Sequence, residues 1–422
     1  MDHFAYKEGV LHAEDIALTT LAEEVGTPFY CYSTATLRRH FEVFRTPFDD
    51  IDHKICYAVK ANSNLAILKV LADCGAGADV VSEGEIRRAL AAGIAPENIV
   101  FSGVGKTQSE MRFALEQDIF QFNIESEAEL LALNAVASEM HTRASIAIRV
   151  NPDVDAKTNA KISTGKKENK FGIDIAKAPE LYARAAVLTG IKVQGVSVHI
   201  GSQLTSVEPF REAFIKVREL VQSLRKSGLR ITTIDVGGGL GVPYERKSAA
   251  PPSPAQYAAV VKDILSDMDC TLIFEPGRLL VGNAGILVTK VIYVKPSDTR
   301  TFAIVDVAMN DLLRPSLYGA HHDIIPVAEP AENIAEVPID IVGPVCETGD
   351  TFAEQRLLPM PASGDLLVFR TAGAYGAVMS STYNSRHLTP EILVDGEKYG
   401  IIRKRQTYDQ MLALDAIPSW LA

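Results

Sequence analysis

Residues 55–63 read Ile-Cys-Tyr-Ala-Val-Lys-Ala-Asn-Ser, and the rest of the chain is organised around them. The first five predict a buried β-strand. Lys60 ends this strand, and Asn62 and Ser63 separate it from a helical pattern that begins at Leu65. A lysine at the end of an apolar strand lies at the mouth of a pocket, where desolvation lowers its pKa and leaves an amine that can attack a carbonyl. The alternative is a lysine that simply reaches into solvent.

The same order of short apolar strand, polar break and amphipathic helix repeats along the following part of the chain. Strands are predicted at 55–59, 78–81, 99–101, 121–124, 145–150, 193–200, 233–236 and 272–274. Apolar strands that alternate with helices are typical of a parallel sheet covered on both faces. Eight such units over about 225 residues match a (β/α)8 TIM barrel, with an open doubly wound sheet as the alternative.

Polar residues or glycines at the strand ends favour the barrel over the open sheet. They are Lys60, Ser82, Ser102, Glu125, Asn151, His199, Gly237 and Glu275. In a barrel these ends meet at one face, which is where active sites are built.

The pattern changes on both sides of the predicted barrel. Long strands with few helical periods are predicted at 285–294, 301–307, 337–342 and 365–369, and they indicate a mainly β domain of sandwich or barrel type. At the start of the chain we predict a helix over 13–25, a strand over 29–32 and a helix over 35–44. The division is therefore a 1–34 segment that joins the β domain, a barrel over 35–281 and the β domain over 282–422.

The composition is that of an ordinary globular protein, with 422 residues and a net charge of −11. This charge argues against a nucleic-acid partner. The sequence has no apolar run of membrane-spanning length and does not start like a signal peptide. Its five cysteines, at 31, 56, 74, 270 and 346, are far apart and form no Cys-x-x-Cys pair. We expect them to be free thiols in a reducing cytoplasm.

Three motifs at strand ends in the barrel carry possible chemistry. The glycine-rich run 237–241 could present backbone N–H groups to a phosphate, or could form only a tight turn. Glu275 could bind a protonated ring nitrogen, or could pair with Arg278. His199 could stack on a planar ring or move protons, although a lone histidine there is more often structural, and no partner at metal-ligand spacing accompanies it.

Three further motifs lie in the β domain. Cys346 stands in a polar loop and is either a proton donor or a partly buried free thiol. Arg314 is either a bidentate ligand of a carboxylate or a surface arginine. Tyr375, between glycines, is either a ligand contact or a loop filler. In the barrel, the long loop over 152–170 carries five lysines and is either a lid or a solvated surface loop.

Taken together, the barrel motifs describe a binding site for one cofactor. A lysine amine, a phosphate cradle, a stacking histidine and an acid for a ring nitrogen fit pyridoxal 5'-phosphate.

Six motifs in order then support a resemblance that covers nearly the whole chain. They lie at residues 57–62, 199–203, 237–239, 275–278, 314–318 and 346–350. The chain resembles the fold-type III pyridoxal-phosphate-dependent decarboxylases, whose barrel is of the alanine-racemase type, and in particular those that act on diaminopimelate. The resemblance implies the decarboxylation of meso-2,6-diaminopimelate to L-lysine and carbon dioxide, the last step of lysine biosynthesis.

The resemblance also implies roles for individual residues. Lys60 would hold the cofactor covalently, His199 would stack on its ring, and Glu275 would pair with the ring nitrogen. The remaining implied cofactor contacts are Ser202, Gly237, Gly238, Gly239, Gly277, Arg278 and Tyr375.

The implied substrate contacts come partly from the β domain. Arg278, Arg314 and Tyr318 would hold the distal carboxylate, Glu347 would face the distal amine, and Tyr375 would touch both cofactor and substrate. Cys346 would donate the proton that replaces carbon dioxide. Cys346 and Glu347 match residues that the family contributes from a partner subunit, which implies a homodimer with shared active sites.

Two other functions compete with this interpretation. An ornithine or arginine decarboxylase of the same fold would need an acid for the cationic end of its substrate, whereas Arg278 and Arg314 favour a carboxylate. A catalytically silent carrier would lack the β domain, and an inhibitor protein would have lost Lys60 or Cys346. A cofactor-free aldolase would need neither Glu275 nor the glycines.

Overall fold

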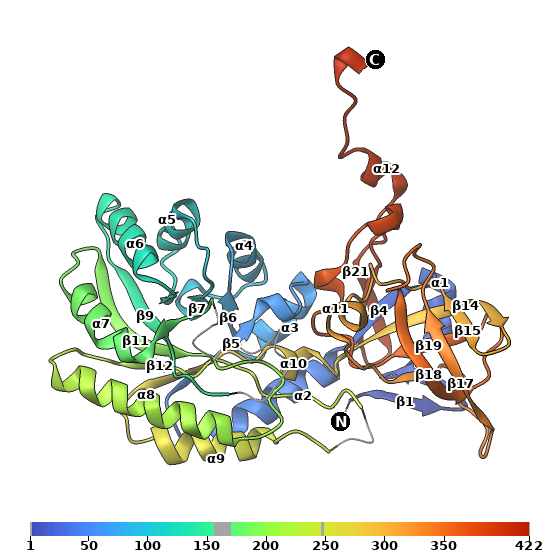
Figure 1. The fold of residues 1–422 in the computed structure, drawn as a ribbon, viewed down its shortest axis with the longest axis horizontal. Helices are drawn as coiled ribbons and strands as arrows, with labels where there is room; N and C mark the ends of the chain where they lie inside the picture. The colour runs from blue at the N-terminus through green and yellow to red at the C-terminus, as the bar shows by residue number, and fades with distance from the viewer. Residues whose placement is uncertain (1, 156–169, 246–248, 422) are drawn as a thin grey trace. The chain divides into compact units, whose positions relative to one another are not determined.

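A computed structural model describes residues 2–155, 170–245 and 249–421 (Figure 1). Most of the 152–170 loop, predicted as a lid or a surface loop, lies outside these residues. The chain divides into two compact units. The barrel unit contains residues 38–243 and 249–280, and the β unit contains 1–37, a short segment from Tyr244 and 281–422. Within the described residues, no helix is both long and apolar enough to cross a membrane.

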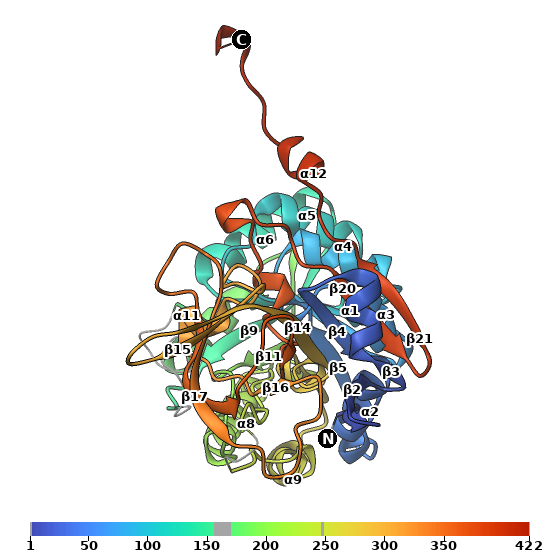
Figure 2. The ribbon, with the colours of Figure 1, turned by 90° about the vertical axis from the view of Figure 1, so that its right-hand side faces the viewer.

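The β unit is built on a nine-stranded sheet (Figure 2). Its strands are β4 (Phe29–Ser33), β14 (Gly285–Pro296), β15 (Thr301–Val305), β16 (Ile324–Pro326), β17 (Glu336–Val342), β18 (Thr351–Pro359), β19 (Leu366–Phe369), β20 (Glu391–Asp395) and β21 (Lys398–Arg403). Strand β4 pairs antiparallel with β14 and parallel with β20. The prediction that the N-terminal segment joins a mainly β domain is therefore confirmed.

The prediction of a helix over 13–25 is only partly right. Helix α1 covers Leu18–Val25, while the residues before it belong to a small sheet of β1 (Phe4–Lys7), β2 (Val10–Ala13) and β3 (Ile16–Ala17). Glu14 forms the turn between β2 and β3 with a φ of 52°, and its carboxylate accepts hydrogen bonds from Ser33 Oγ and Ala35 N. These tertiary contacts override the helical pattern at its start.

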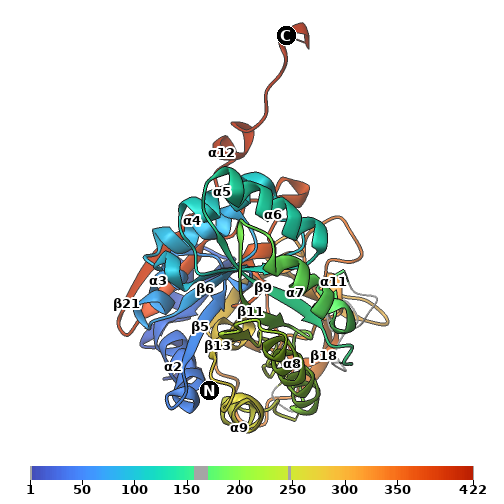
Figure 3. The same ribbon diagram turned by 90° about the vertical axis from the view of Figure 1, so that its left-hand side faces the viewer.

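The barrel unit contains a closed parallel sheet (Figure 3). Its strands are β5 (His53–Ala58), β6 (Gly77–Val80), β7 (Ile99–Phe101), β8 (Gln121–Ile124), β9 (Ala144–Asn151), β11 (Ile191–Val198), β12 (Thr233–Asp235) and β13 (Thr271–Phe274). The sheet closes because β13 pairs with β5 and β8 pairs with β9. A two-residue strand, β10 (Ile173–Asp174), adds to β9. All eight predicted strands and the barrel itself are confirmed.

Helices surround this barrel on the outside (Figure 3). They are α2 (Thr34–Arg45), α3 (Leu65–Asp73), α4 (Glu83–Ala91), α5 (Gln108–Glu116), α6 (Glu127–Glu139), α7 (Ala178–Ala186), α8 (Glu208–Lys226) and α9 (Pro254–Leu265). Several begin directly after a strand because a polar residue there caps the free backbone N–H groups. Asn64, Ser82 and Ser126 cap α3, α4 and α6 in this way.

Candidate active site

Lys60 lies just beyond strand β5, in the 3₁₀ turn η2 (Val59–Ala61). The strand ends at Ala58, one residue earlier than predicted. The Lys60 Nζ lies 2.6 Å from Oδ2 of Asp79, a fully buried carboxylate at the end of β6. The lysine side chain is 41% exposed, so it is only partly desolvated here, and the lowered pKa expected for its amine stays a prediction. The amine is held by a carboxylate at the carboxyl ends of the barrel strands.

A buried acidic pair lies next to this lysine in the barrel unit. Glu275 follows β13, and its Oε1 accepts hydrogen bonds from Ser102 Oγ and Asn123 Nδ2, both at 3.3 Å. The same Asn123 nitrogen donates to Asp235 Oδ2 at 2.6 Å. Burial, together with the negative charges of Asp235 and Asp79, raises the pKa of Glu275 well above its usual value. Burial also raises the pKa of Asp235 to about 6, and a hydrogen bond joins the two carboxyl groups. The raised pKa values favour retention of a proton by this buried pair.

This buried pair predicts a specific dependence of stability on pH. A carboxyl group with a raised pKa in the folded state stabilises the fold at low pH, and this contribution is lost as the pH rises through its folded pKa. We expect the free energy of unfolding of Asp235→Asn to fall less than that of the wild type between about pH 4 and pH 6. Urea denaturation of the cofactor-free protein across this range measures the difference, and parallel curves for the two proteins would refute it.

His199 and the glycine run form a tightly packed turn beside the barrel mouth. The Gly238 N–H donates to His199 Nδ1 at 3.2 Å. Burial and the positive charges of Arg149 and Lys60 keep the pKa of His199 well below its usual value, so its ring is neutral. A Cβ on Gly238 would lie 2.2 Å from the Glu275 carbonyl oxygen, which explains why a glycine is needed there.

The two neighbouring glycines are required for related reasons. Gly237 and Gly239 have φ values of 69° and 107°, and a Cβ at Gly239 would lie 2.3 Å from the Gly201 oxygen. The Gly237 N–H donates to Asp235 Oδ1 at 3.0 Å. Since the Gly237 and Gly238 N–H groups already donate within the protein, the expected cradle of converging N–H groups is not formed at these two positions.

Arg278, Ser202 and Gly277 lie near the same barrel face. Arg278 is buried and donates from Nη2 to Ser202 Oγ at 3.2 Å. A Cβ on Gly277 would approach the Ala58 and Ala61 Cβ atoms to 3.1 and 3.2 Å. The segment after β13 therefore packs directly against the turn that carries Lys60.

The remaining predicted residues belong to the β unit. Arg314 begins the short helix α11 (Arg314–Tyr318) and is buried, so it is not a surface arginine. Its guanidinium lies 4.3 Å from the centre of the Tyr244 ring and 2.7 Å from His322 Nε2. Because arginine can only donate, His322 accepts at Nε2 and donates from Nδ1 to the Arg370 oxygen. Tyr318 is half-buried at the other end of α11.

The loop between β17 and β18 carries Cys346 and Glu347, and both side chains are exposed. The cysteine is therefore not a partly buried thiol. Ser316 on α11 donates to the Gly349 oxygen at 2.6 Å, which places the arginine-bearing helix beside this loop. All five cysteines are free. Tyr375 is half-buried, with a positive φ of 55°.

Sequence reasoning missed Asp79, Asn123 and Asp235. Each is a polar residue within or at the end of a short buried strand, and only closure of the barrel brings them together. The one usable signal was the presence of buried-type polar residues in strands that are otherwise apolar. The described residues contain no cluster of three or more His, Cys, Asp and Glu side chains that could hold a metal ion.

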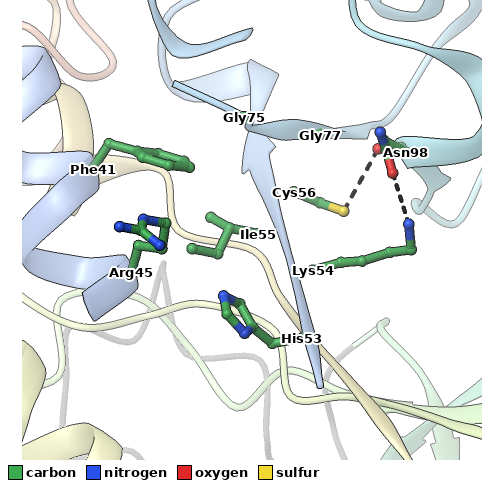
Figure 4. Close-up of a pocket in the computed structure, with 9 residues that line it drawn as sticks. All are labelled: Phe41, Arg45, His53, Lys54, Ile55, Cys56, Gly75, Gly77 and Asn98. Atoms are coloured by element: carbon green, nitrogen blue, oxygen red, sulfur yellow. Dashed lines mark hydrogen bonds between the residues drawn. The ribbon is translucent and has the colours of Figure 1, made fainter. Parts of the chain in front are cut away.

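A cavity of about 180 Å³ lies at the amino-terminal ends of the barrel strands, away from the ends that carry Lys60 (Figure 4). Its lining residues include His53 and Lys54 at the start of β5 and Asn98 just before β7, and Lys54 Nζ donates to Asn98 Oδ1 at 2.7 Å. Active sites of such barrels lie at the carboxyl ends of the strands. This cavity is therefore not the catalytic site.

Comparisons with known proteins agree with this geometry. The family described as "Pyridoxal-dependent decarboxylase, pyridoxal binding domain" matches residues 34–282. The diaminopimelate decarboxylase of Vibrio cholerae is 49% identical over 99% of both chains. The diaminopimelate decarboxylase of Pseudomonas aeruginosa is also 49% identical over 99% of both.

Two solved structures are similar over almost the full length. Diaminopimelate decarboxylase from Helicobacter pylori, in complex with L-lysine, is 43% identical with a TM-score of 0.90, covering 94% of this chain and 98% of that chain. Diaminopimelate decarboxylase from M. jannaschii, also with L-lysine, is 36% identical with a TM-score of 0.94, covering 100% and 99%.

Proposed function

The chain belongs to the diaminopimelate decarboxylases within the pyridoxal-dependent decarboxylase family, and from this premise we propose how its own residues perform the reaction. The reaction is the decarboxylation of meso-2,6-diaminopimelate to L-lysine and carbon dioxide, the last step of lysine biosynthesis, with pyridoxal 5'-phosphate as cofactor. The main support for this function is the similarity to two diaminopimelate decarboxylases over 99% of the chain. Its direct test is an assay of purified protein for lysine from meso-diaminopimelate.

The residues at the barrel mouth fit pyridoxal phosphate. Asp79 is fully buried, and its Oδ1 has no hydrogen-bond partner among the described residues. Such a group is costly unless a ligand or a moving side chain completes its surroundings. Glu275 holds a proton at the position that suits a ring nitrogen. When bound, the cofactor supplies an aldehyde for an amine and a ring that takes up the electron pair left by carbon dioxide.

Each barrel residue then has a proposed task. Lys60 supplies the amine, and Asp79 orients it through the 2.6 Å contact. Glu275 shares a proton with the ring nitrogen, and Asp235 and Asn123 hold its carboxyl group in place. His199, being neutral, presents an uncharged face for stacking.

We assign phosphate binding to groups whose hydrogen-bond donors are not already used within the glycine turn. Gly237 and Gly238 act mainly by allowing close packing, since their N–H groups donate to Asp235 and His199. Gly239, Gly277, Ser202 and the backbone of Arg278 are the proposed phosphate contacts, which leaves the Arg278 guanidinium for the substrate. Tyr375 is also proposed to contact the cofactor. Phosphate oxygens accept strongly from backbone N–H donors.

The specificity of the substrate site is proposed to come from arginine. Arg278, Arg314 and Tyr318 would bind the distal carboxylate, Glu347 the distal amine, and Tyr375 the substrate beside the cofactor. The buried, well-packed guanidinium of Arg314 supports this because its geometry is fixed before binding. A decarboxylase for ornithine would place an acid there, so release of carbon dioxide from meso-diaminopimelate and not from ornithine is the discriminating result.

Cys346 is proposed to protonate the carbon that loses carbon dioxide, from one face, which yields L-lysine. We expect Cys346→Ala to bind cofactor normally but to lower kcat by about a hundredfold, because a positioned proton donor contributes roughly that much. The measurement is steady-state lysine formation together with the visible absorbance of bound cofactor. Unchanged turnover would remove Cys346 from this role, and Cys74→Ala, which changes another free thiol, is the control.

A homodimer is proposed as the active unit, working in the cytoplasm. The free cysteines fit a reducing compartment. Beyond β21 the chain runs away from its own β sheet through α12 (Tyr408–Leu412) (Figure 1). This C-terminal arm exposes apolar side chains by 63 to 83%: Tyr408, Leu412, Leu414, Ile417, Trp420 and Leu421. An apolar surface of this kind is typical of a protein interface.

The exposed C-terminal arm leads to a prediction about dimer formation. We expect removal of residues 407–422 to weaken the dimer by at least tenfold, because the exposed apolar side chains lose their site on the second copy. Analytical ultracentrifugation measures the dissociation constant. Trp420 is the single tryptophan of the chain, so its emission should shift to the blue as the full-length protein dimerises. A truncated protein that dimerises as tightly as the full chain would contradict the prediction.

A further inference from the structure

The loop that carries Cys346 and Glu347 is fixed firmly at its base. Asp350 lies buried at its end and accepts hydrogen bonds from the N–H groups of Val345 at 2.7 Å and Met309 at 2.6 Å. The Gly343 N–H donates to the Asp350 carbonyl oxygen at 2.9 Å. These contacts fix where the loop leaves and rejoins the sheet, but they do not reach its tip.

The tip is held by a second segment that is distant in sequence. The Cys346 N–H donates to Asn384 Oδ1 at 3.0 Å. One residue of this second segment therefore holds the tip of the loop through the backbone of Cys346.

This second segment has an unusual backbone and is anchored on both sides. Asn384 and Ser385 have φ values of 56° and 54°, in the left-handed region that asparagine tolerates better than most residues. Ser381 exchanges hydrogen bonds with Asn310, and Arg386 donates to the Asp306 oxygen. Strained backbone that is fixed on both sides is often found where it orients functional groups.

We propose that Asn384 is a positioning residue of the active site. Asn384 fixes the backbone of Cys346 and thereby aims its Sγ at the substrate carbon. This inference rests on the proposed role of Cys346 as proton donor. Asn384 does not need to touch the substrate.

Three substitutions at Asn384 distinguish the effect of its side-chain oxygen from the effect of its backbone conformation. Asn384→Asp keeps an oxygen acceptor, Asn384→Gly keeps the left-handed conformation without the acceptor, and Asn384→Ala loses both. We expect kcat of the holoenzyme to stay within about threefold for Asp and to fall about tenfold for Gly and at least as far for Ala, with KM little changed. The solvent deuterium isotope effect on kcat should rise in the Gly variant, because proton delivery becomes slower relative to the other steps.

Hydrogen exchange gives a readout that does not depend on activity. The peptide containing Cys346 should exchange its amide faster in Asn384→Gly than in wild type or Asn384→Asp. The proposal would be overturned if Asn384→Gly showed the same amide exchange rate and the same isotope effect as the wild type. This conclusion requires that Cys346→Ala slows turnover. If Cys346→Ala itself leaves turnover unchanged, the proposed role of the thiol fails instead.

Discussion

Replacing Lys60 with alanine should lower kcat for carbon dioxide release by about four orders of magnitude. The amine of Lys60 lies 2.6 Å from Asp79 at the carboxyl ends of the barrel strands. Lys106, in the same unit, is buried and ion-paired with Glu129 at 2.6 Å, so it cannot replace the missing amine. Single-turnover assays with added pyridoxal phosphate measure the loss.

Lys54→Ala is the matched control for this experiment. Lys54 lies on the same strand, β5, but at its other end, where it bonds Asn98. Its removal should change kcat less than twofold and should leave the visible absorbance of the cofactor intact. Comparable losses in the two variants would mean that Lys60 acts through stability and not through chemistry.

The second large effect is expected at Glu275. Glu275→Gln keeps the size of the side chain but removes its acid, and we expect kcat to fall by about a thousandfold. In the cofactor-free protein Glu275 retains a proton, because it is buried near Asp235 and Asp79. A ring nitrogen placed beside it would take this proton and leave a charged hydrogen bond, which an amide cannot form.

Ser102→Ala provides the comparison for Glu275→Gln. Ser102 contacts the same Oε1 at 3.3 Å but carries no charge, so its removal should cost less than about tenfold. The measurement is kcat and kcat/KM for lysine formation in both variants across pH. If Glu275→Gln and Ser102→Ala lose activity equally, the charge on Glu275 is not what the reaction uses.

The fold was predictable because its signals are local. Each barrel strand is a short, mostly apolar run closed by a polar residue or glycine, and several helices start at a capping residue. The β unit was harder to predict, since β20 pairs with β4, which is distant in sequence, and its other neighbour β21 is largely exposed. The helix over 13–25 was overextended because Glu14 bonds Ser33 and Ala35, contacts that no local pattern shows.

In the candidate site, too, local signals were readable from the sequence and contacts between distant residues were not. Lys60, Glu275 and the glycines were found because each stands in a motif that is unusual in itself. Asp79 and Asn123 were missed because their meaning comes only from neighbours on other strands. The pairing of Lys60 with Asp79 was missed for the same reason, since this carboxylate lies on β6 and not in the surrounding sequence.

Reduction with sodium borohydride tests the central claim most directly. The protein is incubated with pyridoxal phosphate, reduced and digested, and the masses of its peptides are measured by mass spectrometry. Our account predicts one pyridoxyl phosphate group per chain, on the peptide containing Lys60, and loss of that label when meso-diaminopimelate is added before reduction. A label on another lysine, or none at all, would contradict it.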